Sequence, residues 1–166
     1  MKKNWLVFCC IMFALACQAV PAQAISKNQE VAIVENCEQI RDDLRTIQKS
    51  DAKLRVHLGS RYEMILSRFI MPLNMRLVEN NLSNAKLVEN QNKFADAKTL
   101  FNNDYIVYQQ SLEELVAMDC KKEPSEFYEK LVKVRQKRKV MERDVLSIRT
   151  LISQHIKLVK GVEGKL

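Results

Sequence analysis

The chain has 166 residues, and its 27 Lys and Arg against 20 Asp and Glu give a formal net charge of +7. It contains only three glycines and three prolines, so folds that need many turns between short strands are excluded. Active sites and cofactor sites are mostly assembled from loops, which this composition does not supply. We therefore expect no enzyme, no catalytic residue, no cofactor and no metal site.

Residues 1–24 have the pattern of a cleaved secretory signal peptide. Two lysines precede an apolar run at residues 5–16, and small residues at 22 and 24 form a cleavage site. The apolar run is too short to span a bilayer in the mature protein. The alternative is a lipoprotein with Cys17 lipidated, although Ala14 occupies a position where such motifs usually carry leucine. We expect a secreted or periplasmic protein, with a lipid-anchored one as the alternative.

After cleavage, Cys37 and Cys120 would be the only cysteines left in the chain. An even number of cysteines in an exported protein favours a disulfide, because oxidising compartments form and keep such bonds. The other interpretation is two buried free thiols. A catalytic cysteine is not favoured, because neither histidine, His57 or His155, belongs to a nucleophile motif.

A first long helix is predicted from near Val31, because apolar residues recur at steps of three and four. Its apolar stripe is made of Val34, Cys37, Ile40, Leu44, Ile47, Leu54, Leu58, Tyr62, Ile65 and Phe69. Pro72 should kink or end this helix near Ile70, since proline removes a helical hydrogen bond. Helix is then expected to resume before a turn at Asn80.

Two further helices follow in the pattern. The second carries five apolar or aromatic residues spaced seven positions apart, namely Leu87, Phe94, Phe101, Tyr108 and Leu115. The third begins at Pro124, where the missing N–H of proline costs nothing. Its stripe is made of Phe127, Leu131, Val134, Met141, Val145, Ile148, Ile152 and Val159. Gly161 should end this helix.

These elements predict an all-α fold, namely an elongated antiparallel three-helix bundle with coiled-coil-like, up-down-up packing. Residues 25–162 would form one domain, and residues 163–166 a flexible tail. A four-helix count is expected only if Pro72 splits the first helix. In the antiparallel arrangement Cys37 and Cys120 meet at one end, so a disulfide would close the base of the bundle.

Two charged residues occupy positions in the apolar stripes, namely Asp51 in the first helix and Arg138 in the third. An unpaired buried charge is costly, so we expect a buried Asp51–Arg138 ion pair at one height of the bundle. The hydroxyl of Tyr105 or Tyr108 should lie nearby. Such a pair can define the register of the helices. The functional alternative is a ligand or proton site.

His155 is a further polar residue in a stripe. When residues are counted along each helix from the same end of the bundle, His155 lies opposite residues 68–69 of the first helix and residues 89–91 of the second. We expect a neutral core histidine bonded to Glu89, Asn90 or Gln91. The alternative is a pH-sensitive switch, because histidine titrates near neutral pH.

Positive charge is concentrated in the last helix: residues 121–166 contain 13 basic and 6 acidic side chains. The candidates for contact with an anionic envelope surface are Lys130, Lys133, Arg135, Lys137 and Lys139. A solvated helix face is the other interpretation. Nucleic acid is not favoured, because no binding motif is present and export is predicted.

Two classes of function remain. The first is a structural or protein-interaction module that binds a partner or self-associates. Apolar residues outside the stripes would form its surface, namely Val31, Ile33, Leu73, Leu77, Leu146, Leu151, Ile156 and Leu158. The second is a chaperone-like or envelope-binding protein that uses the basic third helix. Residues 81–83 also match a glycosylation acceptor with Asn81 as its site.

Overall fold

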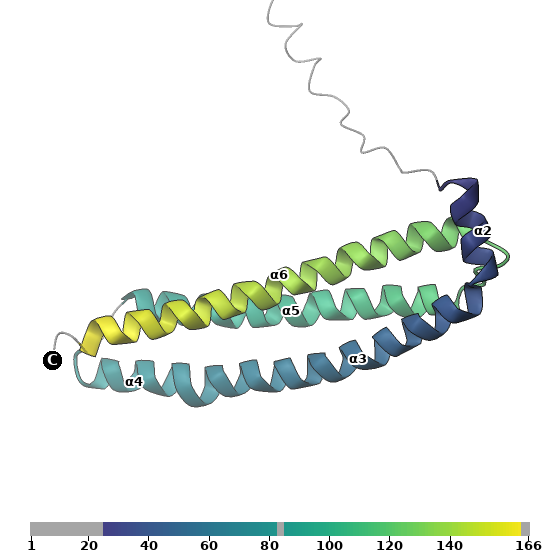
Figure 1. Ribbon diagram of the computed structural model, residues 1–166. Helices are drawn as coiled ribbons and strands as arrows, with labels where there is room; N and C mark the ends of the chain where they lie inside the picture. Colours follow the sequence, from purple (N-terminus) through teal and green to yellow (C-terminus); the bar gives the residue numbers. More distant parts are fainter. Residues whose placement is uncertain (1–24, 83–84, 164–166) are drawn as a thin grey trace, which may run out of the picture.

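The computed structural model describes residues 25–82 and 85–163, and every regular element in these ranges is a helix (Figure 1). The elements are α2 (Lys27–Glu35), α3 (Cys37–Met64), the π-helix η1 (Ile65–Ile70), α4 (Met71–Glu79), α5 (Ala85–Ala117) and α6 (Pro124–Glu163). The all-α prediction is confirmed. The predicted signal peptide, with Cys17, lies outside the described residues.

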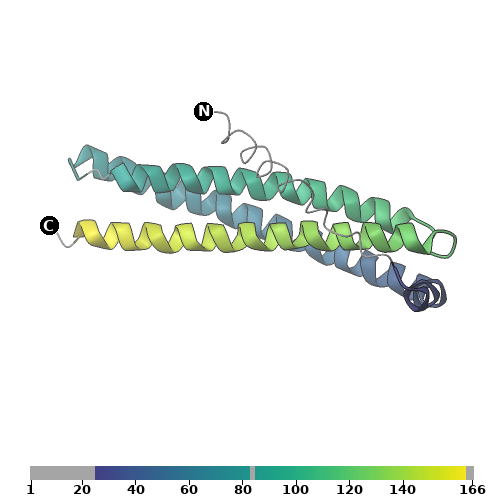
Figure 2. The ribbon, with the colours of Figure 1, turned by 90° about the horizontal axis from the view of Figure 1, so that it is seen from above.

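α3, η1 and α4 follow one another without interruption and form one long, gently curved rod, called here the first rod (Figure 1). α5 runs back along it, and α6 runs in the same direction as the first rod. α2 turns away at the end where α5 meets α6 (Figures 1 and 2). The described residues thus form four helices, and the predicted count of three is wrong.

The additional helix arises at Asn36 and not at Pro72. Asn36 has a backbone φ of −103° and ψ of 15°, and its side-chain amide donates to the Ala32 carbonyl at 2.8 Å. Asparagine competes for backbone hydrogen bonds in this way, so it commonly ends a helix. α2 itself begins with a capping box, in which Ser26 and Gln29 exchange hydrogen bonds.

We predicted that Pro72 would kink or end the helix near Ile70; the first rod does not end there, but its helix type changes from η1 to α4 between Ile70 and Met71. Pro72 lies in the first turn of α4, immediately after η1. The Met71 N–H bonds to the Leu66 carbonyl, five residues back, as in a π-helix. This local widening lets the chain pass a residue that has no N–H to donate.

The turn between α4 and α5 falls where the sequence predicted it. Asn81 has a φ of 59°, a left-handed conformation that asparagine tolerates better than most residues. The Leu82 N–H closes the turn on the Leu77 carbonyl at 2.8 Å. Ser83, the last residue of the glycosylation acceptor, lies outside the described residues. At the other end of the chain, α6 continues through Gly161 to Glu163, so the predicted helix end at Gly161 is wrong.

The buried apolar side chains form two clusters along the bundle. The disulfide-side cluster consists of Ile33, Cys37, Leu44, Tyr105, Tyr108, Leu112, Leu115, Cys120, Phe127, Val134 and Met141. The far cluster consists of Tyr62, Leu66, Ile70, Phe94, Phe101 and Ile148. In the far cluster the Tyr62 ring packs edge-to-face on Phe94 and Phe101, at centroid distances of 6.4 and 5.6 Å.

Candidate functional site

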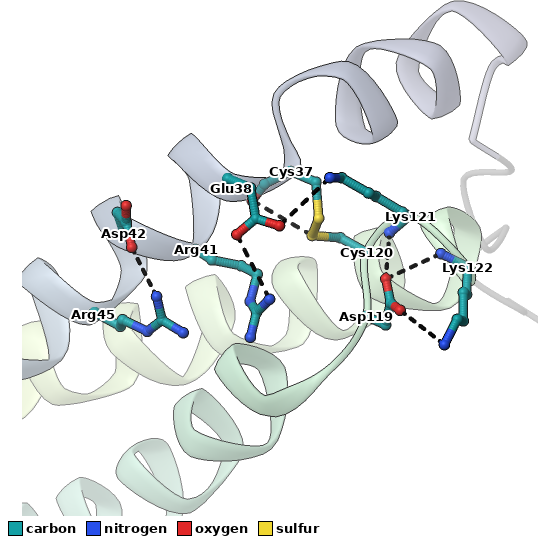
Figure 3. A network of polar contacts seen from close by, with 9 residues as sticks. All are labelled: Cys37, Glu38, Arg41, Asp42, Arg45, Asp119, Cys120, Lys121 and Lys122. Atoms are coloured by element: carbon teal, nitrogen blue, oxygen red, sulfur yellow. Dashed lines mark hydrogen bonds and ion pairs between the residues drawn. A yellow bond between two sulfur atoms is a disulfide. The ribbon is translucent and has the colours of Figure 1, made fainter.

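Cys37 and Cys120 form a disulfide at one end of the bundle, with a Cα–Cα distance of 5.7 Å (Figure 3). Both cysteines are fully buried. The bond joins the start of α3 to the loop after α5, which are 83 residues apart in sequence. Glu38 lies beside it and approaches Arg41 at 3.8 Å and Lys121 at 3.5 Å. Glu38 and Lys121 are exposed and Arg41 is partly buried, so the contribution of these ion pairs to stability is small.

The loop that presents Cys120 is shaped by the preceding residue. The Asp119 carboxylate accepts the backbone N–H of Lys121 at 3.0 Å and that of Lys122 at 3.3 Å (Figure 3). Hydrogen bonding from the Lys122 side chain lowers the pKa of Asp119. Short polar side chains commonly hold tight turns by such bonds. The local sequence therefore positions the sulfur that Cys37 meets.

Asp51 lies at the middle of the bundle and is bound from two helices. The Arg138 Nε and Nη2 donate to its two oxygens at 3.0 and 3.1 Å, and the Tyr108 hydroxyl donates at 2.7 Å. Burial, together with the hydrogen bond to Asp51, raises the pKa of Tyr108. The three side chains hold α3, α5 and α6 at one level.

The expected burial of this pair is only half correct. The Asp51 side chain is 9% exposed, whereas the Arg138 side chain is 46% exposed. The guanidinium therefore reaches solvent while the carboxylate does not. Asp51 accepts three hydrogen bonds, from Tyr108 and Arg138, and so connects side chains of α3, α5 and α6.

A second carboxyl contact, between Asp104 of α5 and Asp144 of α6, escaped the sequence analysis. Asp144 is 9% exposed. Burial, followed by the nearby charge of Asp104, raises the pKa of Asp144 from 3.8 to about 6. The signal in sequence was weak, because Asp144 adjoins the stripe residue Val145. This contact lies between the two apolar clusters, which end on α6 at Met141 and begin at Ile148.

His155 is buried on α6 against α5, in the region that the sequence indicated. Its Nδ1 lies 3.2 Å from the Asn90 side-chain oxygen, and the Asn90 amide donates to the Leu151 carbonyl at 3.3 Å. Burial lowers the pKa of His155, so the ring is neutral near pH 7. With the proton on Nδ1, the other nitrogen Nε2 is a buried acceptor without a hydrogen-bond partner.

Two open apolar hollows, called here together the groove, lie between the first rod and α6, and the rod residues Tyr62 and Leu66 between them are buried. The first hollow is lined by Leu54, Arg55, Leu58, Arg138, Met141, Glu142 and Val145. The second hollow is lined by Phe69, Ile70, Leu73, His155, Ile156, Val159 and Lys160. Leu54 and Phe69 were expected to be core residues, but their exposures are 55% and 62%. That expectation was wrong because α6 does not close over them.

The basic residues of α6 are not equivalent. Lys130 pairs with Glu126 at 3.3 Å, and Lys137 donates a hydrogen bond to the Ser111 hydroxyl. The three others, Lys133, Arg135 and Lys139, are exposed and form no ion pair with any described residue.

The apolar residues outside the stripes also differ in their environment. Val31, Leu146 and Ile156 are exposed, whereas Ile33 is buried in the disulfide-side cluster. The others are partly buried, namely Leu73, Leu77, Leu151 and Leu158. Ile33 therefore cannot belong to an interaction surface.

Within residues 25–82 and 85–163, no three His, Cys, Asp or Glu side chains gather as metal ligands would. No helix in the same ranges is both long and apolar enough to cross a membrane. Comparisons with protein-family models, with curated proteins and with solved structures find no significant match to this chain. Any function has to be argued from the residues described above.

Proposed function

We propose that this protein is an exported, non-enzymatic helical bundle that acts as a protein-interaction module. The observation that carries the proposal is the distribution of exposed apolar side chains. Among the described residues fifteen large apolar side chains are exposed, and seven of them lie between Leu54 and Val78. Scattered exposed apolar residues are common, but a concentration on one rod is typical of a binding surface.

The proposed architecture suits this role. We take the first rod, α5 and α6 as an elongated, antiparallel, coiled-coil-like bundle with α2 as a short appendage. Such a bundle presents long helical faces and few loops, which favours recognition by a partner helix over chemistry in a pocket. The seven exposed residues of the first rod are Leu54, Val56, Met64, Phe69, Met71, Met75 and Val78.

Export is the second part of the proposal. The disulfide between Cys37 and Cys120 suits an oxidising compartment, where such bonds persist. The signal-peptide pattern in residues 1–24 supports the same location, secreted or periplasmic. Lipidation at Cys17 is the alternative, and mass spectrometry of the protein from its native host separates the two.

Site-specific photo-crosslinking in the native host tests the interaction role. A photoreactive amino acid at Met75 should form a discrete cross-linked product, whereas one at the exposed polar Thr150 should not. Light scattering of the mature protein, with and without reductant, then shows whether the product is a second copy. A monomer that gives no product from any of the seven exposed positions would overturn the proposal.

One observation favours a second candidate, a protein that contacts an anionic envelope surface. Lys133, Arg135 and Lys139 project from α6 without ion pairs to described residues. In that case the protein should bind vesicles containing anionic lipid and should release them at high salt. Charge reversal by Lys133→Glu with Lys139→Glu should abolish this binding, and no effect of the reversal would exclude α6 as the contact.

A further inference from the structure

The groove between the first rod and α6 is the place where the bundle is least complete. α5 packs closely against both α3 and α6, whereas α3 and α6 make few close backbone approaches to each other. Asp51 and Arg138 bridge them at one level. Two hollows remain open between the helices, although Tyr62 and Leu66 of the first rod and Ile148 of α6 are buried in the far cluster between them. In a four-helix bundle, the corresponding position is filled by another helix.

The groove has an apolar floor with the spacing of a core. Leu54 and Phe69 belong to the stripe that elsewhere faces the core, yet they are 55% and 62% exposed. On α6, Ile156 is 51% exposed and lines the same groove. From the start of the first hollow at Leu54 to the end of the second at Leu73 the first rod covers about 28 Å of helix, with the buried Tyr62 and Leu66 in between. A partner helix of ordinary length would match this span.

The charge along the groove is positive. Arg55 and Arg138 line its first hollow, and Lys160 lines the second. The lining also contains Asp51 and Glu142; because Asp51 and Arg138 neutralise each other, the remaining charges are Arg55 and Lys160 against Glu142. An occupant with acidic flanks would complement this charge.

From these observations we infer that the groove between the first rod and α6 binds an acidic amphipathic helix of a partner protein. This inference rests on the proposed interaction function and names the class of partner. A second copy of this chain is less suitable, because α6 and the distal part of the first rod are both basic. Residues 53–78 of the rod carry five Lys or Arg and a single acidic residue, Glu63.

A designed peptide serves as the probe. It is a helix of about 20 residues with leucines at helical spacing and glutamates on both flanks. Fluorescence anisotropy should show that it binds the oxidised mature protein and that salt weakens the binding. A matched peptide with lysine in place of every glutamate should bind at least about tenfold more weakly. Equal binding of the two peptides would overturn the inference.

Paired variants locate the site. Leu54→Glu and Phe69→Glu place a negative charge in the groove and should each weaken binding of the acidic peptide by about tenfold or more. Leu100→Glu and Val107→Glu add the same charge at exposed apolar positions of α5 that do not line the groove, and should leave the affinity unchanged. All four positions are exposed, so circular dichroism should show an unchanged fold. Equal losses in both pairs would overturn the inference.

The outcomes also separate this inference from the proposed function. Cross-linked products from Met75, together with no peptide binding, would retain the interaction module and reject the acidic helix. A dimer that Phe69→Glu dissociates would assign the groove to a second copy and would likewise reject it. Vesicle binding that Phe69→Glu abolishes, without peptide binding, would assign the groove to lipid. Absence of both cross-links and peptide binding would reject the two proposals together.

Discussion

The two ends of this bundle are built differently. At one end the disulfide-side cluster packs around a covalent bond between Cys37 and Cys120, and a carboxylate, a tyrosine and an arginine bridge three helices at its edge. At the other end the far cluster has no disulfide and depends on aromatic packing and on amide contacts. There Asn74 donates to the Gln91 side chain at 2.8 Å, and Asn90 contacts His155.

The difference extends to the surface. The π-helix, Pro72 and most of the exposed apolar residues of the first rod belong to the far half, where the groove beside α6 also continues. Regions without strong constraints open more easily, and binding surfaces are drawn from such regions. The molecule therefore concentrates its stability at one end and its candidate binding surface at the other.

Removal of the disulfide should have the largest effect. Cys37→Ser with Cys120→Ser releases a cross-link between residues 83 apart, which the chain-entropy model values at about 4 kcal/mol, with less in practice. Urea denaturation should show this loss in the free energy of unfolding. Hydrogen exchange should increase first in α2 and at the start of α3. A larger early increase in α4 would contradict the division between the two ends.

Substitution of Arg138 and substitution of Asp51 should lower the free energy of unfolding by different amounts. Arg138→Ala leaves a buried carboxylate with only the Tyr108 hydroxyl, and should cost about 3 kcal/mol. Asp51→Asn leaves an arginine that is 46% exposed and can be hydrated, so it should cost about 1 kcal/mol. Urea denaturation of the two single variants and the double variant measures both costs and their coupling. Equal costs would mean that the arginine is as desolvated as the aspartate.

The carboxyl contact at the boundary between the clusters should make stability depend on pH. The folded state raises the pKa of Asp144 to about 6, so it binds this proton more tightly than the unfolded chain does. Its contribution to stability is therefore present at low pH and is lost as the pH rises through about 4 to 6.

Asp144→Asn should stabilise the protein by about 1–2 kcal/mol near pH 8 and have little effect near pH 4. Denaturation at the two pH values tests this difference. His155 acts in the opposite direction, because burial lowers its pKa and stability is lost as the pH falls through that value. The wild-type protein and the Asp144→Asn variant both contain His155, so its contribution cancels in the difference between them at each pH. The same gain in the free energy of unfolding at both pH values would contradict a raised pKa of Asp144.

Pro72→Ala should have the smallest effect, because η1 already accommodates the missing N–H. We expect a change of less than about 1 kcal/mol in the free energy of unfolding. Lys49→Pro, at an exposed position inside α3, is the matched control and should cost about 3 kcal/mol or more. A comparable cost for both variants would mean that the π-helix does not serve the proline.

Local spacing along the chain was enough to determine the helical class and most of the core. Phe94 and Tyr108 are buried where the seven-residue spacing of the second predicted helix places them, and Ile148 is buried where the apolar stripe of the third places it. Counting residues along antiparallel helices also brought Cys37 to Cys120 and Asp51 to Arg138, because helix rise per residue is constant.

The distance between helices, in contrast, is decided only in the tertiary structure. Leu54 and Phe69 follow the same local pattern as buried residues, yet they line an open groove because α6 packs on α5 and not on them. The burial of Asp144 depends in the same way on a neighbouring helix, whereas the break at Asn36 and the π-helix before Pro72 have local causes that the spacing of apolar residues does not record. Periodicity records which side of a helix is apolar, but not whether another helix covers it.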